Sequence, residues 1–215
     1  MKTRFYPNLH LTNPLQGVIF TQAFVKLNPT DALDVLQKNL PATLLEKYGL
    51  AKTQTKEITH IGQLVPLLIP LKTDELFAAG INKFSREFKK AGVTVYSYHF
   101  DRGNPFETPL KGIAHHALDL AYTSGNFENA WPDKKDEQLS NALIKYWIDF
   151  ANGKEPWDSA ASGKALHITT DAETKVVPRE KVASRRWDGY VEMEKCWDKV
   201  RAVGNAMLLP KMGKL

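Results

Sequence analysis

The sequence predicts a single α/β domain on the basis of three observations. A predicted amphipathic helix over Thr73–Lys90 runs through a glycine turn into Val93–Phe100, whose β-branched and aromatic residues are typical of a strand. A helix, a tight turn and a strand in this order form half of a crossover unit, which favours a sheet covered by helices. Two further strands, Ala165–Thr170 and Thr174–Pro178, follow a helix predicted over Lys134–Phe150. A length of 215 residues fits one domain.

The first predicted elements are short and are separated by proline and glycine. Leu15–Phe24 is expected to be a short strand, or a strand end that turns into a helix, with Gly17 at the turn. A helix over Ala32–Leu40 follows, with Thr30 as its candidate N-cap, and a second helix covers Ala42–Tyr48. Two short helices in succession indicate a cap-like helical layer.

The remaining helices are predicted from apolar spacing. In Thr73–Lys90 the apolar residues recur at intervals of four, three and four, and Thr73 is the candidate N-cap. The last helix is expected over residues 184–203, with one apolar face. The apolar residues that define these two faces are Phe77, Ile81, Phe84 and Phe88 in the first, and Tyr190, Met193, Trp197 and Val200 in the second.

Composition argues against several classes of function. The chain is 43% hydrophobic and 25% charged, so it can build a core. Its net charge of +5 is a mild excess without a run of basic residues, so we expect no nucleic-acid partner. The single cysteine, Cys196, allows no intrachain disulfide and no cysteine-rich metal site. No apolar run is long enough to span a membrane, and the first residues lack the apolar region of a signal peptide, so a cytoplasmic location is the default expectation.

Two adjacent histidines, His115 and His116, follow the main predicted strand in a segment that resembles a loop. Loops beyond the strands of an α/β sheet often carry catalytic groups, and a histidine there can act as a general base. The residue types alone leave a second interpretation open, in which both are ordinary loop or core histidines. A metal site is not expected, because no nearby cysteine or glutamate completes a ligand set, and no cofactor is expected.

The order of four segments resembles the C-terminal part of type-B carboxylesterases, which are cholinesterase-like α/β hydrolases. His116–Tyr122 (HALDLAY) is similar to the family's His-Gly-x-Asp-Leu-x-Tyr segment. Val93–Arg102 resembles a late central strand, Tyr146–Trp157 the end of a helix, and Trp187–Lys199 the C-terminal helix with Cys-x-x-Trp or a near variant. The likeness extends over roughly Leu15–Lys199. It implies a partial α/β-hydrolase fold over residues 1–215, with the last sheet strands, a helical cap segment and the C-terminal helices.

The resemblance also implies roles for particular residues. Aligning Asp119 and Tyr122 with the family's acidic and aromatic positions puts His116, not His115, at the place of the general base. Ala117 stands where the family has glycine, so the turn after His116 is expected to shift. Gln16 in Gln16–Phe20 (QGVIF) stands where the family has the triad acid, in Glu-Gly-x-x-Phe. A glutamine carries no charge to stabilise the imidazolium. An alternative is that Gln16 is a plain polar loop residue outside this register.

The nucleophile is missing from the sequence. Hydrolases of this fold carry it in Gly-x-Ser-x-Gly, and no serine here has glycine two positions before and after it. We therefore expect a carboxylic ester hydrolase-like chain that binds a small-molecule ester only with the missing half and is inactive alone. The alternative is a non-catalytic interaction module that associates with a complementing N-terminal half or forms a homo-oligomer. A basic surface-binding protein is the weakest alternative.

Overall fold

The computed structural model describes residues 9–12, 16–127 and 129–208. The chain divides into two compact units, and each is described by itself. The sheet unit comprises Met1–Gln16 and Ile81–Arg185, and the helical unit comprises Gly17–Gly80 and Arg186–Leu215. The chain therefore passes between the units three times, and the helical unit is completed only by residues from the end of the sequence.

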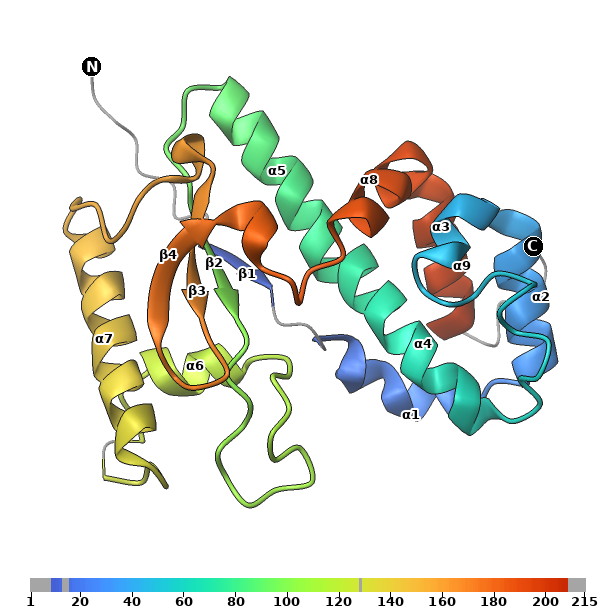
Figure 1. The fold of residues 1–215 in the computed structure, drawn as a ribbon, viewed down its shortest axis with the longest axis horizontal. Coiled ribbons are helices and arrows are strands. Elements are labelled where there is room, and N and C mark those ends of the chain that lie inside the picture. The colour runs from blue at the N-terminus through green and yellow to red at the C-terminus, as the bar shows by residue number, and fades with distance from the viewer. Residues whose placement is uncertain (1–8, 13–15, 128, 209–215) are drawn as a thin grey trace. The chain divides into compact units, whose positions relative to one another are not determined.

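The sheet unit is built on four strands in the order β1-β2-β3-β4 (Figure 1). They are β1 (Leu9–Thr12), β2 (Tyr96–Phe100), β3 (Lys164–Ile168) and β4 (Thr174–Pro178). The first three are parallel, and β4 pairs with β3 in antiparallel register, so the two strands predicted over Ala165–Thr170 and Thr174–Pro178 are confirmed and form a hairpin. Strand β2 begins later than the predicted Val93–Phe100. Because β1, β2 and β3 are parallel, their carboxyl ends lie at one edge of the sheet.

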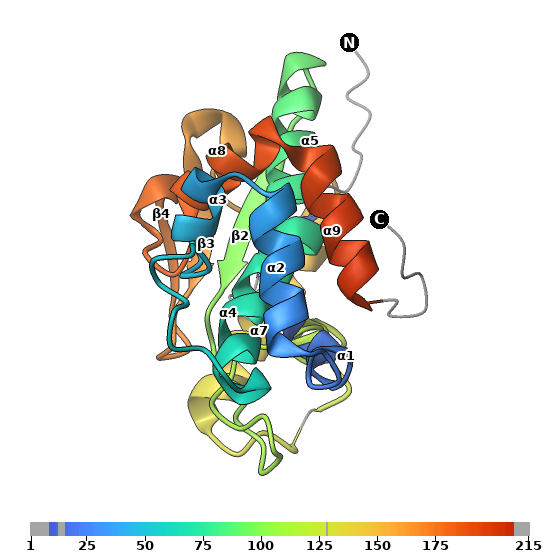
Figure 2. The ribbon, with the colours of Figure 1, turned by 90° about the vertical axis from the view of Figure 1, so that its right-hand side faces the viewer.

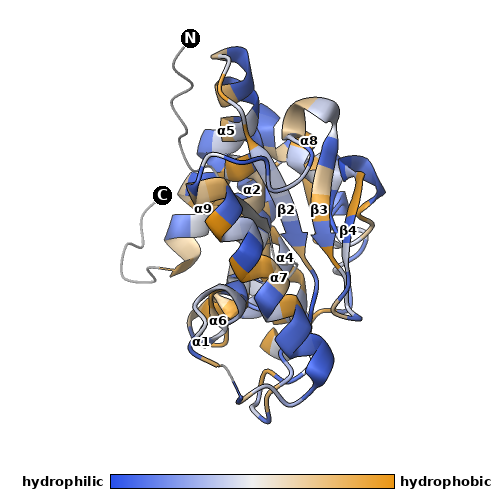
Figure 3. Cartoon of the chain, turned by 90° about the vertical axis from the view of Figure 1, so that its left-hand side faces the viewer, coloured by the Kyte–Doolittle hydropathy of each residue, from blue (hydrophilic) through white to orange (hydrophobic). Residues whose placement is uncertain are grey.

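Every residue of β2 is buried, and alternate side chains point to opposite faces. Tyr96, Tyr98 and Phe100 share the face covered by α6 (Leu118–Thr123) and α7 (Lys134–Ala151). Tyr98 meets Trp147 of α7 edge to face, with ring centroids 5.7 Å apart, which is a favourable aromatic geometry. The predicted helix over Lys134–Phe150 is thus confirmed. Figure 3 shows hydrophilic and hydrophobic residues interspersed along it, as in an amphipathic helix.

The helical unit has its own apolar core, to which leucines contribute most of the fully buried side chains. Leu33, Leu36 and Leu40, which recur at helical spacing in the helix predicted over Ala32–Leu40, are all buried. Helices α2 and α9 lie side by side (Figure 2). The helices that make up this unit, apart from the start of α5, are α1 (Thr21–Phe24), α2 (Pro29–Asn39), α3 (Ala42–Glu46), α4 (Ile61–Thr73), α8 (Trp187–Lys195) and α9 (Trp197–Leu208).

Two predictions for the N-terminal elements are wrong. Within the described part of Leu15–Phe24, the chain forms a 3₁₀ turn over Gln16–Phe20 followed by α1, with no strand. Asn28, not Thr30, caps α2, because its side chain accepts hydrogen bonds from the backbone N–H groups of Thr30 and Asp31. With Pro29 at the first helical position, Asn28 is the residue just outside the helix, where a cap must lie.

The helix predicted to begin at Thr73 starts earlier. Helix α4 continues through a π-helical turn, Asp74–Ala78, into α5 (Ala79–Lys90), so Thr73 lies inside a continuous helical run and not at an N-cap. The hydroxyl of Thr73 donates to the carbonyl of Ile69 one turn back. Phe84, expected on the apolar face, is 62% exposed.

The predicted last helix is two helices, α8 and α9, which meet at Cys196. Cys196 leaves helical geometry, with φ −136° and ψ 33°. Tyr190, Met193 and Val200 of the predicted apolar face are buried as expected. The apolar period therefore continues across the break, which explains why the sequence reads as one helix.

Candidate functional site

The loop between β2 and α6 begins at the carboxyl end of β2 and carries both histidines. Asn104 holds the two sides of this loop together: its backbone N–H donates to the carbonyl of Ile113 (3.0 Å), and its carbonyl accepts from Gly112 (2.8 Å). The Asn104 side chain lies 3.3 Å from Nε2 of His115. Asn104 is itself buried. The sequence analysis missed this residue, whose position in an otherwise irregular loop gives no local signal.

His115 stabilises the conformation of the loop. Its Nδ1 lies 2.9 Å from the carbonyl oxygen of His116, so Nδ1 must carry the proton and donate. Nε2 is then the acceptor for the Asn104 amide. Both ring nitrogens of His115 are thus used inside the loop. That His116, and not His115, is the histidine placed for chemistry stays a prediction.

The turn directly after His116 is made by Ala117, whose φ of +62° and ψ of 9° lie in the left-handed region. Glycine adopts this conformation at little cost, whereas alanine is strained there. The alanine itself takes up the left-handed geometry, and the shift of the turn relative to the family stays a prediction. Helix α6 begins at the next residue, Leu118, so the strained position fixes where His116 stands relative to α6.

Asp119 lies in the first turn of α6 and is 3% exposed. Its Oδ2 accepts a hydrogen bond of 2.9 Å from the Tyr98 hydroxyl of β2. Burial raises the pKa of Asp119 above its ordinary value, while the hydrogen bond from Tyr98 and the nearby charge of His116 act in the opposite direction. Asp119 therefore ties the start of α6, directly after the histidine loop, to the sheet.

A second carboxylate, Asp136 of α7, fixes the carboxyl end of β2. Arg102 binds it with two hydrogen bonds, from Nε (2.7 Å) and Nη2 (2.8 Å), and the Tyr122 hydroxyl donates to it at 2.6 Å. Asp136 is fully buried. This bidentate geometry holds β2, α6 and α7 in one arrangement around the loop.

Gln16, the residue at the predicted acid position, is 1% exposed and begins the 3₁₀ turn. The next residue, Gly17, donates its backbone N–H to the Thr73 hydroxyl at 2.7 Å. The chain passes from the sheet unit to the helical unit between Gln16 and Gly17. The pairing of Gln16 with His116 therefore stays a prediction.

The sheet unit also contains a serine, a histidine and an aspartate close together. The Ser184 hydroxyl and His167 Nε2 both contact Oδ2 of Asp101, at 2.6 and 2.8 Å, and Arg185 binds Oδ1 at 2.8 Å. A catalytic triad needs the histidine between the other two residues. Here the aspartate lies between, so the cluster is a partly buried polar network that tethers the segment after β4 to the end of β2.

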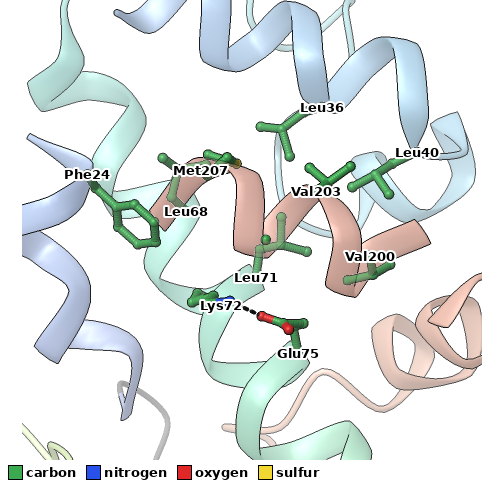
Figure 4. A pocket seen from close by; sticks show the side chains of 11 residues that line it. Phe24, Leu36, Leu40, Leu68, Leu71, Lys72, Glu75, Val200, Val203 and Met207 are labelled. Carbon is green, nitrogen blue, oxygen red and sulfur yellow. Dashed lines mark hydrogen bonds and ion pairs between the residues drawn. The ribbon is translucent and has the colours of Figure 1, made fainter. Parts of the chain in front are cut away.

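The helical unit encloses an apolar pocket with a volume of about 310 Å³ when its opening to solvent is included. A buried ion pair between Lys72 and Glu75 lies at one end of it, and apolar side chains surround the rest (Figure 4). The Lys72 ammonium also lies 5.7 Å from the centre of the Phe20 ring. Burial raises the pKa of Glu75, against the hydrogen bond and charge of Lys72. The sequence analysis missed this pair, although two charges directly after an apolar run were a possible signal.

None of the helices in the described ranges combines the length and apolar composition that a membrane crossing requires. Nor do three or more His, Cys, Asp or Glu side chains in those ranges come together as metal ligands would.

Comparison with known proteins assigns the chain to a family. The sequence profile of the carboxylesterase family matches residues 9–192. The structure is similar to carboxylesterase EST55 of Geobacillus stearothermophilus, with 18% identity and a TM-score of 0.60 over 85% of this chain and 40% of that chain. It is also similar to a PNB esterase structure, with 22% identity and a TM-score of 0.53 over 83% of this chain and 37% of that one. No curated protein sequence matches.

The chain thus spans about 40% of the length of the EST55 chain. The two structural likenesses establish the fold as a partial α/β-hydrolase fold, in agreement with the sequence analysis. The profile match covers most of the 215 residues, including the loop that carries His116. On this evidence, the chain belongs to the carboxylesterase family.

Proposed function

We propose that this chain supplies His116 as the general base of a carboxylic ester hydrolase that works through an acyl-enzyme. The observation that carries the proposal is the position of His116: it follows the carboxyl end of β2, in a loop braced by Asn104, and directly precedes the left-handed turn at Ala117. In an α/β sheet, ligands bind outside the carboxyl ends of the strands. In this scheme His116 takes the proton of a serine and gives it to the leaving alcohol as the acyl-enzyme forms, and it then takes a proton from the water that hydrolyses the acyl-enzyme.

The serine of this site comes from polypeptide outside the 215 residues. No serine of the sequence lies in Gly-x-Ser-x-Gly, and Ser184 donates its hydroxyl to Asp101 instead of to a histidine. This chain covers only 40% and 37% of the length of the two matched relatives, so the larger part of each relative has no counterpart here. The chain on its own is therefore expected to hydrolyse no ester.

The acid of the site is proposed to be replaced by Gln16. An amide can orient an imidazole through a hydrogen bond, but it does not stabilise the imidazolium, and this change of acid to amide costs orders of magnitude in rate in serine hydrolases. Gln16→Glu in an assembled site should therefore raise kcat. An unchanged kcat would place Gln16 outside the triad while leaving His116 untouched.

The first test is the hydrolysis of p-nitrophenyl acetate by the purified chain. We expect wild type, His116→Ala and His60→Asn to give the same rate. His60 is a matched control, because it lies at the N-cap of α4 in the helical unit and asparagine keeps its capping ability. Turnover that His116→Ala abolishes and His60→Asn preserves would contradict the absence of a nucleophile.

The second test supplies the missing part. The chain is co-purified with a carboxylesterase segment that carries Gly-x-Ser-x-Gly and corresponds to the portion of the relatives with no counterpart here. A stable complex should hydrolyse the ester, and His116→Ala should slow it by about 10²–10⁴-fold, the usual contribution of a general base. A complex that is active and insensitive to His116→Ala would overturn the assignment.

A second candidate function is that of a non-catalytic interaction module. Within the described ranges β1 pairs only with β2, so its outer edge presents backbone donors and acceptors without a neighbouring strand. Such an edge favours the addition of a strand from another chain. Size-exclusion chromatography with light scattering tests this candidate: a monomer at all concentrations that binds no complementing segment would exclude it.

A further inference from the structure

A second pocket lies wholly within the sheet unit, away from the histidine loop. Its volume is about 780 Å³ when the opening to solvent is included. It is bounded by α5, by the segment that enters β2, and by the 3₁₀ turns over Ala160–Ser162 and Arg179–Lys181. The lining residues are Ser85, Arg86, Lys89, Val93, Val95, Ala160, Ala161, Gly163, Arg179 and Glu180.

The walls of this pocket are joined by backbone hydrogen bonds. Ala160 donates to the carbonyl of Val95 at 2.7 Å, and Gly163 donates to the carbonyl of Ala160 at 3.1 Å. Arg179 in turn donates to the carbonyl of Gly163 at 2.9 Å. Three segments that are distant in sequence are thus fixed to one another, so the pocket is a built feature of the fold and not a space between loose loops.

The charge of the lining favours an anion. Arg86, Lys89 and Arg179 are cationic, and Glu180 is the only acidic residue among the lining side chains of this described pocket. In the described part of the chain, the Lys89 ammonium has no ion-pair partner, whereas the adjacent Lys90 pairs with Glu87 at 2.9 Å. An excess of positive charge around a concave surface attracts anionic ligands.

One hydroxyl of the lining can bind a polar ligand group. Ser85 of α5 lines the pocket and is only 7% exposed, and its side-chain hydroxyl forms no hydrogen bond with any described residue. The hydroxyl can therefore donate to a ligand without giving up a hydrogen bond within the protein. An oxygen of a bound anion would satisfy this donor.

The remaining lining is apolar. Val93 and Val95 come from the segment that enters β2, and Ala160 and Ala161 from the first 3₁₀ turn. Val95 is 4% exposed. A few convergent polar groups on an otherwise apolar wall are typical of sites for small organic molecules.

We propose that this pocket binds a small organic anion: a carboxylate or phosphate group held by Ser85, Lys89 and Arg179, with a short apolar body on the valines and alanines. The pocket lies where the chain enters β2, whereas His116 follows the opposite end of that strand. The site therefore has no part in ester cleavage, and the inference does not depend on the proposed function.

The test is calorimetric titration of the 215-residue chain with phenyl phosphate, inorganic phosphate, phenylacetate and phenethylamine. Saturable binding of phenyl phosphate or phenylacetate is expected at millimolar concentration or below, with inorganic phosphate weaker and phenethylamine not bound. Comparing the two organic anions identifies the preferred headgroup. Inorganic phosphate that binds as tightly as phenyl phosphate, or binding of the amine, would overturn the proposal.

Four variants separate specific binding from a general effect of charge. Ser85→Ala should weaken binding about tenfold through the lost hydrogen bond to a charged group, while alanine preserves α5. Lys89→Gln should weaken it about threefold to fivefold, and Glu180→Gln should strengthen it by a similar factor. Lys90→Gln, one residue away and outside the pocket, should leave binding unchanged. Equal effects of Lys89→Gln and Lys90→Gln, or an unaffected Ser85→Ala, would contradict the site.

Discussion

The backbone at Ala117 determines where the histidine loop ends and α6 begins. A left-handed conformation costs an alanine about 1 kcal/mol relative to glycine. The loop retains this conformation because its neighbours are held: Asn104 ties the loop together, and Asp119 anchors the first turn of α6 to Tyr98. The contacts of Asn104 and Asp119 thus determine the position of His116 more strongly than the histidine side chain does.

Replacing Ala117 with glycine should stabilise the protein by about 1 kcal/mol, because glycine removes the strain of a positive φ. Hydrogen exchange of the α6 amides reports this change locally. Ala121→Gly is the matched control, since Ala121 lies inside the same helix. Glycine at this position should lower the free energy of unfolding by about 1 kcal/mol. Equal loss of stability in both variants would show that Ala117 is not strained.

Asp101 should make the sheet unit acid-sensitive. Burial acts to raise its pKa, but the hydrogen bond from His167, the charge of Arg185 and the hydrogen bond from Ser184 outweigh burial and lower the pKa to about 2. A carboxyl group with a lowered pKa stabilises the fold above its unfolded pKa, near 4, and this contribution is lost as the pH falls toward 2. The contribution is roughly 2 kcal/mol.

Asp101→Asn should therefore cost about 3–5 kcal/mol near neutral pH, because it breaks the ion pair between Asp101 and the buried Arg185. The difference between wild type and variant should shrink between pH 4 and pH 2. Hydrogen exchange of the β2 amides as a function of pH measures this difference in stability within the sheet unit. Asp171→Asn, at an exposed position in the hairpin turn, is the control; a difference that does not change with pH would refute the role of Asp101.

At the scale of elements, the 3₁₀ turn that starts at Gln16 packs closely on α4. A side chain on Gly17 would lie 2.6 Å from the carbonyl oxygen of Ile69 and 2.9 Å from the Thr73 hydroxyl. These are contacts with the end of α4, where the helix passes into its π-helical turn. Glycine is therefore required at this position for close approach of two backbones, and not for an unusual φ.

Gly17→Ala should destabilise the helical unit by about 1–3 kcal/mol, because backbone atoms on α4 cannot move aside. Gly80→Ala is the control within the same unit: its new methyl group would lie 3.6 Å from the Trp197 ring, an ordinary contact, and alanine in a helix should gain roughly 0.5–1 kcal/mol. Chemical denaturation, monitored by hydrogen exchange of the α4 amides, should show a lower free energy of unfolding for Gly17→Ala and a higher one for Gly80→Ala. A stabilised Gly17→Ala variant would disprove the close approach.

At the scale of the whole molecule, the chain has two separate apolar cores. One belongs to the helical unit and includes Leu36, and the other belongs to the sheet unit and includes Leu166. Leu36→Ala and Leu166→Ala should each cost about 2–5 kcal/mol. Each variant should raise hydrogen exchange first in its own unit, and a uniform rise in both units would show one cooperative core.

The sequence predicted the elements whose signals are local. The hairpin of β3 and β4 and the helix α7 were found because turn residues and apolar spacing lie inside each segment. Thr73 was misassigned because a threonine before an acidic residue looks the same inside a longer helix as at its start. At the site, resemblance singled out His116, but nothing local revealed Asn104 or the Lys72–Glu75 pair, whose roles depend on contacts between segments.

The division of the helical unit between the two ends of the chain has a consequence for synthesis. Helices α1 to α4 are synthesised before Ile81–Arg185, yet Val200, Val203 and Met207 of α9, which complete their core, are made only after that segment. Domains otherwise tend to fold from the N-terminus as they emerge. The leucines of α2 and α4 therefore remain without their final partners until α9 has been made, and their apolar surface is open to aggregation while the sheet unit is synthesised.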